Sequence, residues 1–456
     1  MKLEGKKTVV LLGSLMLALS ACGGGGSSDS GKSENAGGAA GEGSKTEVKA
    51  DGAALAKQVS EQPAELTFYM TSNGITEERF MQQYGDQIKK KFPNYTIKYI
   101  MQQNSRTLQD LVATNQTVDV MISSIGLTPA FLLTYNLQND ISDLMKKNDY
   151  DDSKLEPTTL EIQRQLANGG IYGLPVNTTS TALFYNKDLF DKFGVAYPKD
   201  GMNWDDLYEL AKTMSRTDGG VKYRGLTFAF QHMMFLNQYS APHLDPKTNK
   251  ALFMEDNFIR AFENMARFYR IPGNELPNNK FALSNQQDPF YKDKSVAMIL
   301  TLSGAGKTFG DQVNWDVVQV PFLKDKPGVG PQNYPTYFYI TNMSKNRDAA
   351  FQVLAYVTSE EFQEWQIKAG TPSILKDQSK IISQFGADEP IYKGKNIKSL
   401  LPAKFAEPTM KTKFQSIADT EILAALGEYA AGKDVNTALR EAAERADKKI
   451  AAELGK

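Results

Sequence analysis

From about residue 65 onward the chain alternates short β-rich runs with longer helical stretches, and this alternation is the strongest constraint on its fold. The run ELTFYM (65–70) is strand-like. The stretch after it (76–92) carries Phe80, Tyr84 and Ile88 at four-residue spacing, as on one face of a helix. The runs YTIKYIM and VDVMIS repeat the strand pattern. Because alternating strands and helices are typical of α/β proteins, we predict an α/β fold.

Chain length and charge narrow the class of protein further. About 390 residues follow the N-terminal segment, more than a single hydrophobic core accommodates, so two domains are expected. The 52 basic and 53 acidic residues nearly cancel, leaving a net charge of −1. Since nothing in this balance attracts a polyanion, we expect no nucleic-acid partner.

The N-terminus has the features of an export signal. Three lysines precede an apolar stretch (8–19), which is shorter than the roughly 20 residues that a membrane-spanning helix needs. The closing letters Leu-Ser-Ala-Cys resemble the lipobox of bacterial lipoproteins, and Cys22 is the only cysteine. We therefore expect residues 1–21 to be a signal peptide and Cys22 to carry lipid, which would hold the protein at the outer face of the cell membrane.

Residues 22–62 begin with a Gly/Ser-rich stretch and contain few apolar side chains that could pack. Chains of this kind are flexible, and forty residues span roughly 35 Å on average. The sequence therefore predicts a lipid-anchored tether that lets the body move beside the membrane.

The run TLSGAGKT is a near match to a phosphate-binding loop. Gly306, Lys307 and Thr308 fit the pattern, but Thr301 stands where the first glycine is required. The strand VDVMIS carries Asp119 near its start, whereas a magnesium-holding aspartate belongs at a strand's end. An exported protein also meets little nucleoside triphosphate, so we do not expect a nucleotide-hydrolysing enzyme.

Several motifs appear in one order along the chain: YGLP, FYNKDLFDKFG, NWDDLYELAK, DKSVAMIL, VVQVPFL and a helix pair that ends in KAGTPSIL. Together they resemble the extracellular solute-binding proteins of bacterial ABC importers, in the branch that includes many sugar and oligosaccharide binders. The resemblance covers residues from about 65 to 450.

This resemblance implies a two-lobed, periplasmic-binding-protein-like fold (type II) with the ligand in a cleft between the lobes. Hinge closure around the ligand is an established mode of such proteins. The chain would pass between the lobes near 175–181, near 317–321 and after Gly370. The expected boundaries are 63–176 and 320–371 for lobe I, and 177–319 and 372–456 for lobe II.

Polar loops at strand ends are the candidate ligand site, because backbone N–H groups are unpaired there. Sugars also stack on aromatic faces. The tryptophan that the family often carries after the Ala-Met strand is missing from TLSGAGKT, so stacking would fall to Phe230, Tyr334 and Tyr337. The expected ligand-binding residues are Asn73, Ser123, Ser124, Asn177, Thr178, Thr179, Phe230, Gln231, Ser303, Gly304, Tyr334 and Tyr337.

Within TLSGAGKT we assign three roles. Gly304 lets the backbone approach a neutral ligand closely, and Ser303 offers a hydroxyl. Lys307 is expected to point to solvent at the start of the next helix.

Metal and catalytic chemistry find little support. The two histidines, His232 and His243, lack neighbouring strong ligands in the sequence, and the loop 245–256 has Lys where a calcium loop needs other residues. The adjacent pairs Asp151–Asp152 and Asp205–Asp206 diverge, unlike the facing carboxylates of a glycosidase. We expect no metal and no cofactor.

The leading interpretation is a monomeric, non-catalytic protein that captures a small polar solute outside the cytoplasm, a carbohydrate or oligosaccharide, and delivers it to the membrane permease of an ABC importer. Two alternatives stay open: a secreted lipoprotein hydrolase that acts on cell-surface polysaccharide, and a binder of another solute such as a peptide, which the missing tryptophan allows. A purely structural surface lipoprotein is a further possibility, and it would not close on any ligand.

Lipid attachment at Cys22 is testable in the full chain. Cys22→Ser removes the thiol to which lipid would be added, so we expect the variant to leave the lipoprotein processing route, whereas the wild type stays in the membrane fraction with a lipid-modified N-terminal cysteine. Fractionation and mass spectrometry of the N-terminus measure both. Unchanged membrane retention with normal cleavage in the serine variant contradicts the prediction.

Overall fold

The computed structural model describes residues 52–103, 107–276, 281–377 and 382–455. The predicted signal peptide, Cys22 and the tether up to residue 51 lie outside these residues. The described residues all belong to one compact unit, which begins at Ala50.

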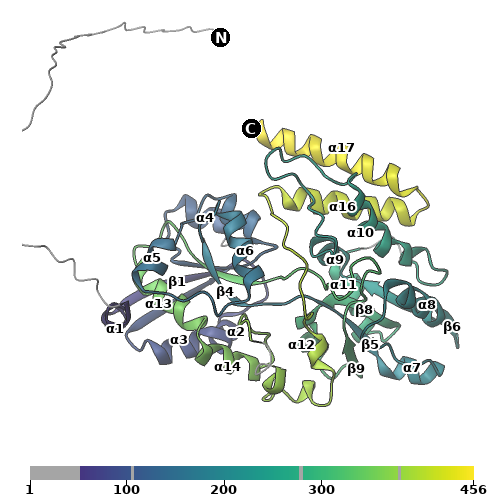
Figure 1. The fold of residues 1–456 in the computed structure, drawn as a ribbon, viewed down its shortest axis with the longest axis horizontal. Helices are drawn as coiled ribbons and strands as arrows, with labels where there is room; N and C mark the ends of the chain where they lie inside the picture. Colours follow the sequence, from purple (N-terminus) through teal and green to yellow (C-terminus); the bar gives the residue numbers. More distant parts are fainter. Residues whose placement is uncertain (1–51, 104–106, 277–280, 378–381, 456) are drawn as a thin grey trace, which may run out of the picture. The chain divides into compact units, whose positions relative to one another are not determined.

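The first sheet has five strands in the order β2-β1-β3-β10-β4 (Figure 1). Strands β1, β2 and β3 are parallel, and β10 runs antiparallel to both β3 and β4. The strand bounds are β1 (Ala64–Met70), β2 (Tyr95–Met101), β3 (Val120–Ser124), β4 (Gly173–Asn177) and β10 (Thr336–Ile340). Its helices are α1 (Gly52–Glu61), α2 (Glu77–Phe80), α3 (Asp86–Lys91), α4 (Leu108–Ala113), α5 (Ser142–Lys147), α6 (Pro157–Leu166), α13 (Arg347–Val357) and α14 (Glu360–Lys368).

The predicted helix face beside this sheet is confirmed. Phe80, Tyr84 and Ile88 are all buried in the same hydrophobic cluster, and the Phe80 ring stacks on Tyr99 of β2 with centroids 4.4 Å apart. The middle turn differs from an α-helix, since Met81–Gly85 is π-helical. A side-chain stripe at four-residue spacing therefore survives a locally wider turn.

The second sheet also has five strands, in the order β6-β7-β8-β5-β9. Strands β7 and β8 are parallel, while β5 is antiparallel to both of its neighbours. The strand bounds are β5 (Thr181–Asn186), β6 (Arg216–Asp218), β7 (Val221–Phe228), β8 (Val296–Leu302) and β9 (Trp315–Val318). Its helices are α7 (Lys187–Phe193), α8 (Trp204–Met214), α9 (Phe230–Phe235), α10 (Asp256–Ala266), α11 (Leu283–Tyr291), α12 (Gly306–Phe309), α16 (Gln415–Ala430) and α17 (Val435–Leu454).

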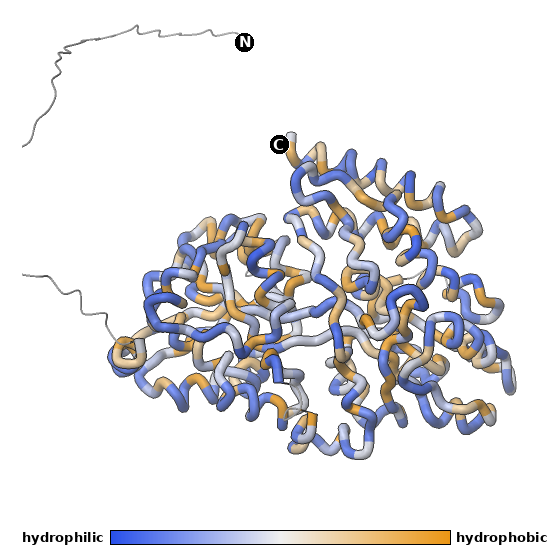
Figure 2. Tube along the Cα trace, viewed as in Figure 1, coloured by the Kyte–Doolittle hydropathy of each residue, from blue (hydrophilic) through white to orange (hydrophobic). Residues whose placement is uncertain are grey.

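The helices of the second sheet follow from local sequence. Asn203 caps α8 and forms a capping box with Asp206, while Trp204, Leu207 and Met214 are buried along one side of the helix. The closing helix α17 packs on α16, and apolar and polar residues alternate along it (Figure 2). Helices α8 and α17 thus each bury an apolar stripe.

The predicted tether is too long at its C-terminal end. Residues 52–61 form α1, which packs against α13. Val59 lies against the hydrophobic cluster that contains Phe80, and its carbonyl accepts a hydrogen bond from the Tyr95 hydroxyl at 3.3 Å. Leu55 and Val59 stand four residues apart, so the sequence did contain a short helical signal there.

Candidate functional site at the junction of the two sheets

Two segments that connect the sheets are hydrogen-bonded to each other. Residues 178–180 lead from β4 to β5, and residues 319–335 lead from β9 to β10. The Thr179 N–H donates to the Tyr334 carbonyl at 3.2 Å, and the Tyr334 N–H donates to the Thr179 carbonyl at 2.8 Å. Because each segment holds the other, the two connections form one short ribbon.

Two consecutive residues of this ribbon are tied to different sheets. The Gln332 N–H donates to the Leu236 carbonyl at 2.9 Å, and its Nε2 donates to the Asn237 carbonyl at 3.0 Å, just after α9. Asn333 Nδ2 donates to the Glu156 carboxylate at 3.0 Å, at the start of α6. Adjacent residues of the ribbon are therefore bonded to segments associated with different sheets.

The Tyr334 side chain touches both sheets. Its hydroxyl lies 3.3 Å from Ser124 Oγ at the end of β3, and its ring meets His232 and Phe235 of α9 edge-on, with centroids 5.6 and 5.7 Å away. A Cβ atom on Gly126 would come within 2.2 Å of that hydroxyl, so glycine permits the close approach. Burial raises the pKa of Tyr334, which keeps its hydroxyl available as a donor.

Hydroxyl groups from the end of β8 and from the connection 178–180 reach the same junction. Ser303, directly after β8, accepts a hydrogen bond from the Ser180 N–H at 3.2 Å, and Thr179 Oγ1 donates to the Tyr334 carbonyl at 3.1 Å. A Cβ atom on Gly304 would lie 3.7 Å from the Thr179 methyl, an ordinary contact. The sequence-predicted residues that gather at this junction are Ser124, Thr179, Gly304 and Tyr334. Ser303 also lies here, but it is 1% exposed and its hydroxyl serves an internal hydrogen bond. Gln231 directly precedes His232, whose ring meets Tyr334.

Four other predicted residues are placed differently. Asn73 is exposed in the loop after β1. Asn177 is partly buried, and its Nδ2 donates to the Tyr84 hydroxyl at 2.7 Å. Ser123 and Thr178 are 1% and 0% exposed, so in this structure their side chains serve internal hydrogen bonds rather than a solvent-facing surface.

Two of the predicted stacking residues are in hydrophobic clusters. Phe230 is 1% exposed and packs against Phe262 and Tyr269, with centroids 5.6 and 6.3 Å away. Tyr337 is fully buried, and its hydroxyl donates to the Thr159 carbonyl at 2.7 Å. Neither ring presents a face to a ligand here, because each is buried within a hydrophobic cluster, so we leave both out of the proposed site.

Lys307 is exposed at the start of α12, as expected, and it also contacts a neighbouring helix. Its ammonium donates to the Ala369 carbonyl at the C-terminal end of α14 and lies 3.7 Å from Glu389. A cation near the last carbonyls of a helix is favoured by the helix dipole, which explains why the ammonium lies at this helix end. Asp119 is likewise structural, since it accepts from the Thr67 N–H at 3.0 Å. Neither residue is arranged as in a phosphate site.

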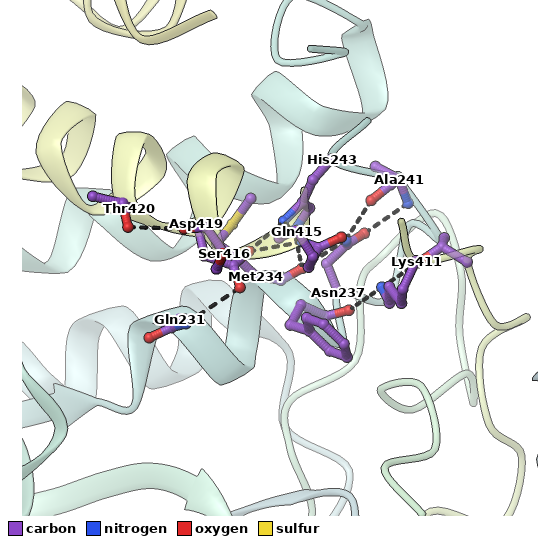
Figure 3. Close-up of polar contacts among 12 residues, drawn as sticks. Gln231, Met234, Asn237, Ala241, His243, Lys411, Gln415, Ser416, Asp419 and Thr420 are labelled. Carbon is purple, nitrogen blue, oxygen red and sulfur yellow. Dashed lines mark hydrogen bonds and ion pairs between the residues drawn. The ribbon is translucent and has the colours of Figure 1, made fainter. Parts of the chain in front are cut away.

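A buried polar cluster lies beside the junction, where α9 meets α16 (Figure 3). Asp419 is 7% exposed, and three side chains surround its carboxylate. Gln415 Nε2 donates to Oδ1 at 2.8 Å, His243 Nδ1 lies 2.9 Å from Oδ1, and Gln231 Nε2 donates to Oδ2 at 3.2 Å. Burial alone would raise the pKa of Asp419, but these hydrogen bonds and the positive charge that His243 can carry hold its pKa below its usual range.

Lys411 is buried next to this cluster (Figure 3). Its ammonium donates to the Phe235 carbonyl at 3.1 Å and to the Thr409 hydroxyl, and it lies over the Phe235 ring, 3.9 Å from the centroid. Burial lowers the pKa of Lys411 to about 7, although the charge of Asp419 partly opposes that shift. The lysine therefore changes charge near neutral pH.

Sequence reasoning missed the positions of His232 and Asp419. His232 follows Gln231 directly, and burial lowers the pKa of its imidazole, so the ring beside Tyr334 is neutral at neutral pH. Asp419 is 188 residues from Gln231 in sequence, and no local pattern marks the contact. Only the packing of α16 on α9 brings it there.

The described residues offer little to catalysis. Within them, no three His, Cys, Asp or Glu side chains gather as metal ligands would. Asp205 pairs with Arg267 at 2.8 Å and with Lys324 at 2.8 Å, whereas Asp206 belongs to the capping box of α8. These carboxylates thus have structural partners and do not face each other. Among the described residues, no helix has both the length and the apolar character needed to cross a membrane.

Comparison with protein families identifies the family of this chain. The family described as bacterial extracellular solute-binding protein matches residues 73–364, more than half of the sequence, so the chain belongs to this family. It is therefore a solute-binding protein rather than an enzyme.

Curated relatives match only in part. The arabinooligosaccharide-binding protein of Bacillus subtilis (strain 168) is 27% identical over 208 residues, which cover 44% of this chain and 46% of that protein. A putative binding protein of Brucella abortus (strain 2308) is 41% identical over 56 residues, 12% of this chain and 13% of that protein. The chain thus matches less than half the length of either relative.

Solved structures share the fold over most of the chain. An ABC substrate-binding protein of Listeria monocytogenes in complex with cycloalternan has a TM-score of 0.68 at 17% identity, covering 86% of this chain and 100% of that one. A solute-binding protein of Agrobacterium vitis S4 with bound D-mannitol has a TM-score of 0.60 at 19% identity, covering 86% and 99%. The predicted α/β, two-lobed periplasmic-binding-protein-like fold is confirmed.

The charge of Lys411 gives a pH-dependent contribution to stability. Its pKa is about 7 when folded, against 10.5 for the free side chain, so between these values the unfolded chain binds more protons and stability rises with pH. We expect the free energy of unfolding of the wild type to gain about 1–3 kcal/mol over Lys411→Met between pH 6.5 and 9.5. Urea unfolding at both pH values measures it.

The matched control is Lys413→Met, two residues away and exposed. The difference in the free energy of unfolding between this variant and wild type should be nearly the same at both pH values. If Lys411→Met also shows a constant difference, the pKa of Lys411 is not lowered in the folded protein as described.

Proposed function

We propose that the protein captures a carbohydrate, in particular an oligosaccharide, outside the cytoplasm and delivers it to the membrane permease of an ABC importer. The observation that carries the proposal is the convergence of uncharged hydrogen-bonding side chains from both sheets on the ribbon around Tyr334. Family membership supports the solute-binding role.

The chemistry of this junction suits a neutral polyhydroxylated ligand. Hydroxyl and amide groups provide donors and acceptors, and Tyr334 adds an aromatic ring. Asp419 is already surrounded by donors, and the lowered pKa of His232 keeps that ring neutral. A charged ligand would therefore find no free counter-charge among these residues.

We further propose that the two sheets form lobes that close on the ligand, with 63–176 and 320–371 in one lobe and 177–319 and 372–456 in the other. The paired connections and the opposite anchoring of Gln332 and Asn333 support a hinge at this place. The signal peptide at 1–21, lipid on Cys22 and a monomeric state complete the proposal, and the sequence alone supports these three points.

A panel of neutral sugars tests the ligand class. Arabinotriose follows from the curated relative, while mannobiose, mannotriose and D-mannitol follow from the ligands named for structures of similar fold. We expect at least one of them to raise the melting temperature and to bind in calorimetry, because a ligand bound only by the folded state stabilises it. Short peptides and ATP serve as negative panels.

The sugars recovered after incubation should be intact, since a binding protein returns its ligand unchanged whereas a hydrolase shortens it. Binding of peptides but of no sugar would contradict the carbohydrate proposal.

Gly304 tests where the sugar binds. A Cβ has room there, so Gly304→Ala should keep both fold and affinity. The two methyl groups of Gly304→Val should reach into the proposed site and weaken calorimetric affinity about tenfold, roughly the effect of 1.4 kcal/mol. Both variants should melt within a few degrees of wild type. Equal affinity of the valine variant and wild type would place the ligand elsewhere.

A further inference from the structure

The amide of Gln231 has a fixed orientation. Its Nε2 lies 3.2 Å from Asp419 Oδ2 (Figure 3). A carboxylate only accepts hydrogen bonds, so the amide must turn its NH₂ group toward Asp419. The Oε1 atom then lies on the other side of the amide, and no described residue donates to it. Because Gln231 is exposed, this oxygen is open to an incoming donor.

The carboxylate that fixes Gln231 is itself held in place. Gln415, one turn earlier on α16, donates to its Oδ1 at 2.8 Å, and His243 lies against the same oxygen. Both carboxylate oxygens therefore have partners, and the group is buried. A buried and fully bonded carboxylate has little freedom to rotate, since losing one of its hydrogen bonds is costly at low dielectric.

His243 closes the network back onto the helix that carries Gln231. Its Nε2 lies 3.2 Å from the carbonyl of Met234 in α9. A carbonyl only accepts, so Nε2 carries a proton, while Nδ1 faces Asp419 and Gln415. The network thus links α9 and α16 at two points, through Gln231 and through the Met234 carbonyl.

We propose that Asp419 is a positioning residue for ligand recognition: it holds the Gln231 amide so that its carbonyl oxygen is presented as a hydrogen-bond acceptor to a ligand hydroxyl. This inference rests on the proposed function, because it takes Gln231 as a ligand contact. It adds a preference for ligands that donate a hydrogen bond at this point. A site built around such an acceptor discriminates against analogues that lack the donor.

A purely structural role is the competing explanation, because the same contacts join α9 to α16. The two roles differ in what they couple. If Asp419 is a positioning residue, its substitution changes affinity only when Gln231 is present. If Asp419 is purely structural, its substitution changes stability, and any effect on affinity is the same with or without Gln231.

A double-mutant cycle separates them. Calorimetry with the tightest-binding sugar of the panel compares wild type, Gln231→Ala, Asp419→Ala and the double variant, with melting curves to confirm folding. Each single variant should bind about tenfold more weakly, and the double variant no more weakly than Gln231→Ala. Thr420→Ala, at the exposed next position of α16, should bind like wild type. Losses that multiply in the double variant, or unchanged affinity of Asp419→Ala, overturn the proposal.

Gln231→Glu tests the same contact while keeping Asp419, Gln415 and His243 in place. At pH 7.5 its carboxylate would face that of Asp419, and the repulsion should displace it and weaken binding about tenfold relative to wild type. As the pH falls to 5, protonation of Glu at this position restores a donor to Asp419, so the affinity relative to wild type should recover. Gln231→Met, which has neither donor nor acceptor, should stay weak throughout.

Other titratable groups lie around Asp419, namely His232, His243, Lys411 and Tyr334. Each affinity is therefore expressed as a ratio to wild type at the same pH, which removes the pH effects that these groups have on both proteins. A ratio for Gln231→Glu that does not change with pH overturns the proposal.

Failure of the proposed function gives a different result: the wild type itself then binds no sugar of the panel. In that case the side-chain amide protons of Gln231 in the free protein provide the readout by NMR. Slow exchange in wild type that becomes fast in Asp419→Ala supports positioning, and equal exchange in the two proteins overturns it.

Discussion

The reciprocal backbone hydrogen bonds between Thr179 and Tyr334 are the contact on which the rest of the site depends. They join the two connections into one ribbon, and the neighbouring residues Gln332 and Asn333 are bound to opposite sheets. The Tyr334 side chain therefore starts from a backbone that belongs to neither sheet alone, which explains how one ring contacts both Ser124 and His232. Loss of this pairing would separate the polar groups that the two sheets bring together.

The junction and the cluster beside it differ in the charge of their polar groups. Around Tyr334 the polar groups are hydroxyls and backbone amides, whereas the charged groups lie in the adjacent cluster, where Asp419 and Lys411 are buried. Burying a charge is tolerated only with partners, and the carboxylate of Asp419 has three. The cluster therefore adds rigidity next to the site without adding a free charge to it.

Local patterns predicted local structure well, and side-chain directions less well. The periodicity of Phe80, Tyr84 and Ile88 correctly predicted a buried helix face. Strand ends were also located, but an aromatic residue there can point either inward or outward. Phe230 and Tyr337 point inward, and their burial depends on residues from distant segments that no window of the sequence contains.

The sequence by itself determined the α/β class, the positions of the main strands and the family resemblance, because these follow from spacing and composition over stretches of a few to some twenty residues. Only the tertiary structure decided which polar groups meet. Thr179 and Tyr334 are 155 residues apart, and Gln231 and Asp419 are 188 apart. Such contacts depend on how sheets and helices pack in three dimensions, and hydrophobic periodicity records only which face of an element is buried, not which distant residue it will touch.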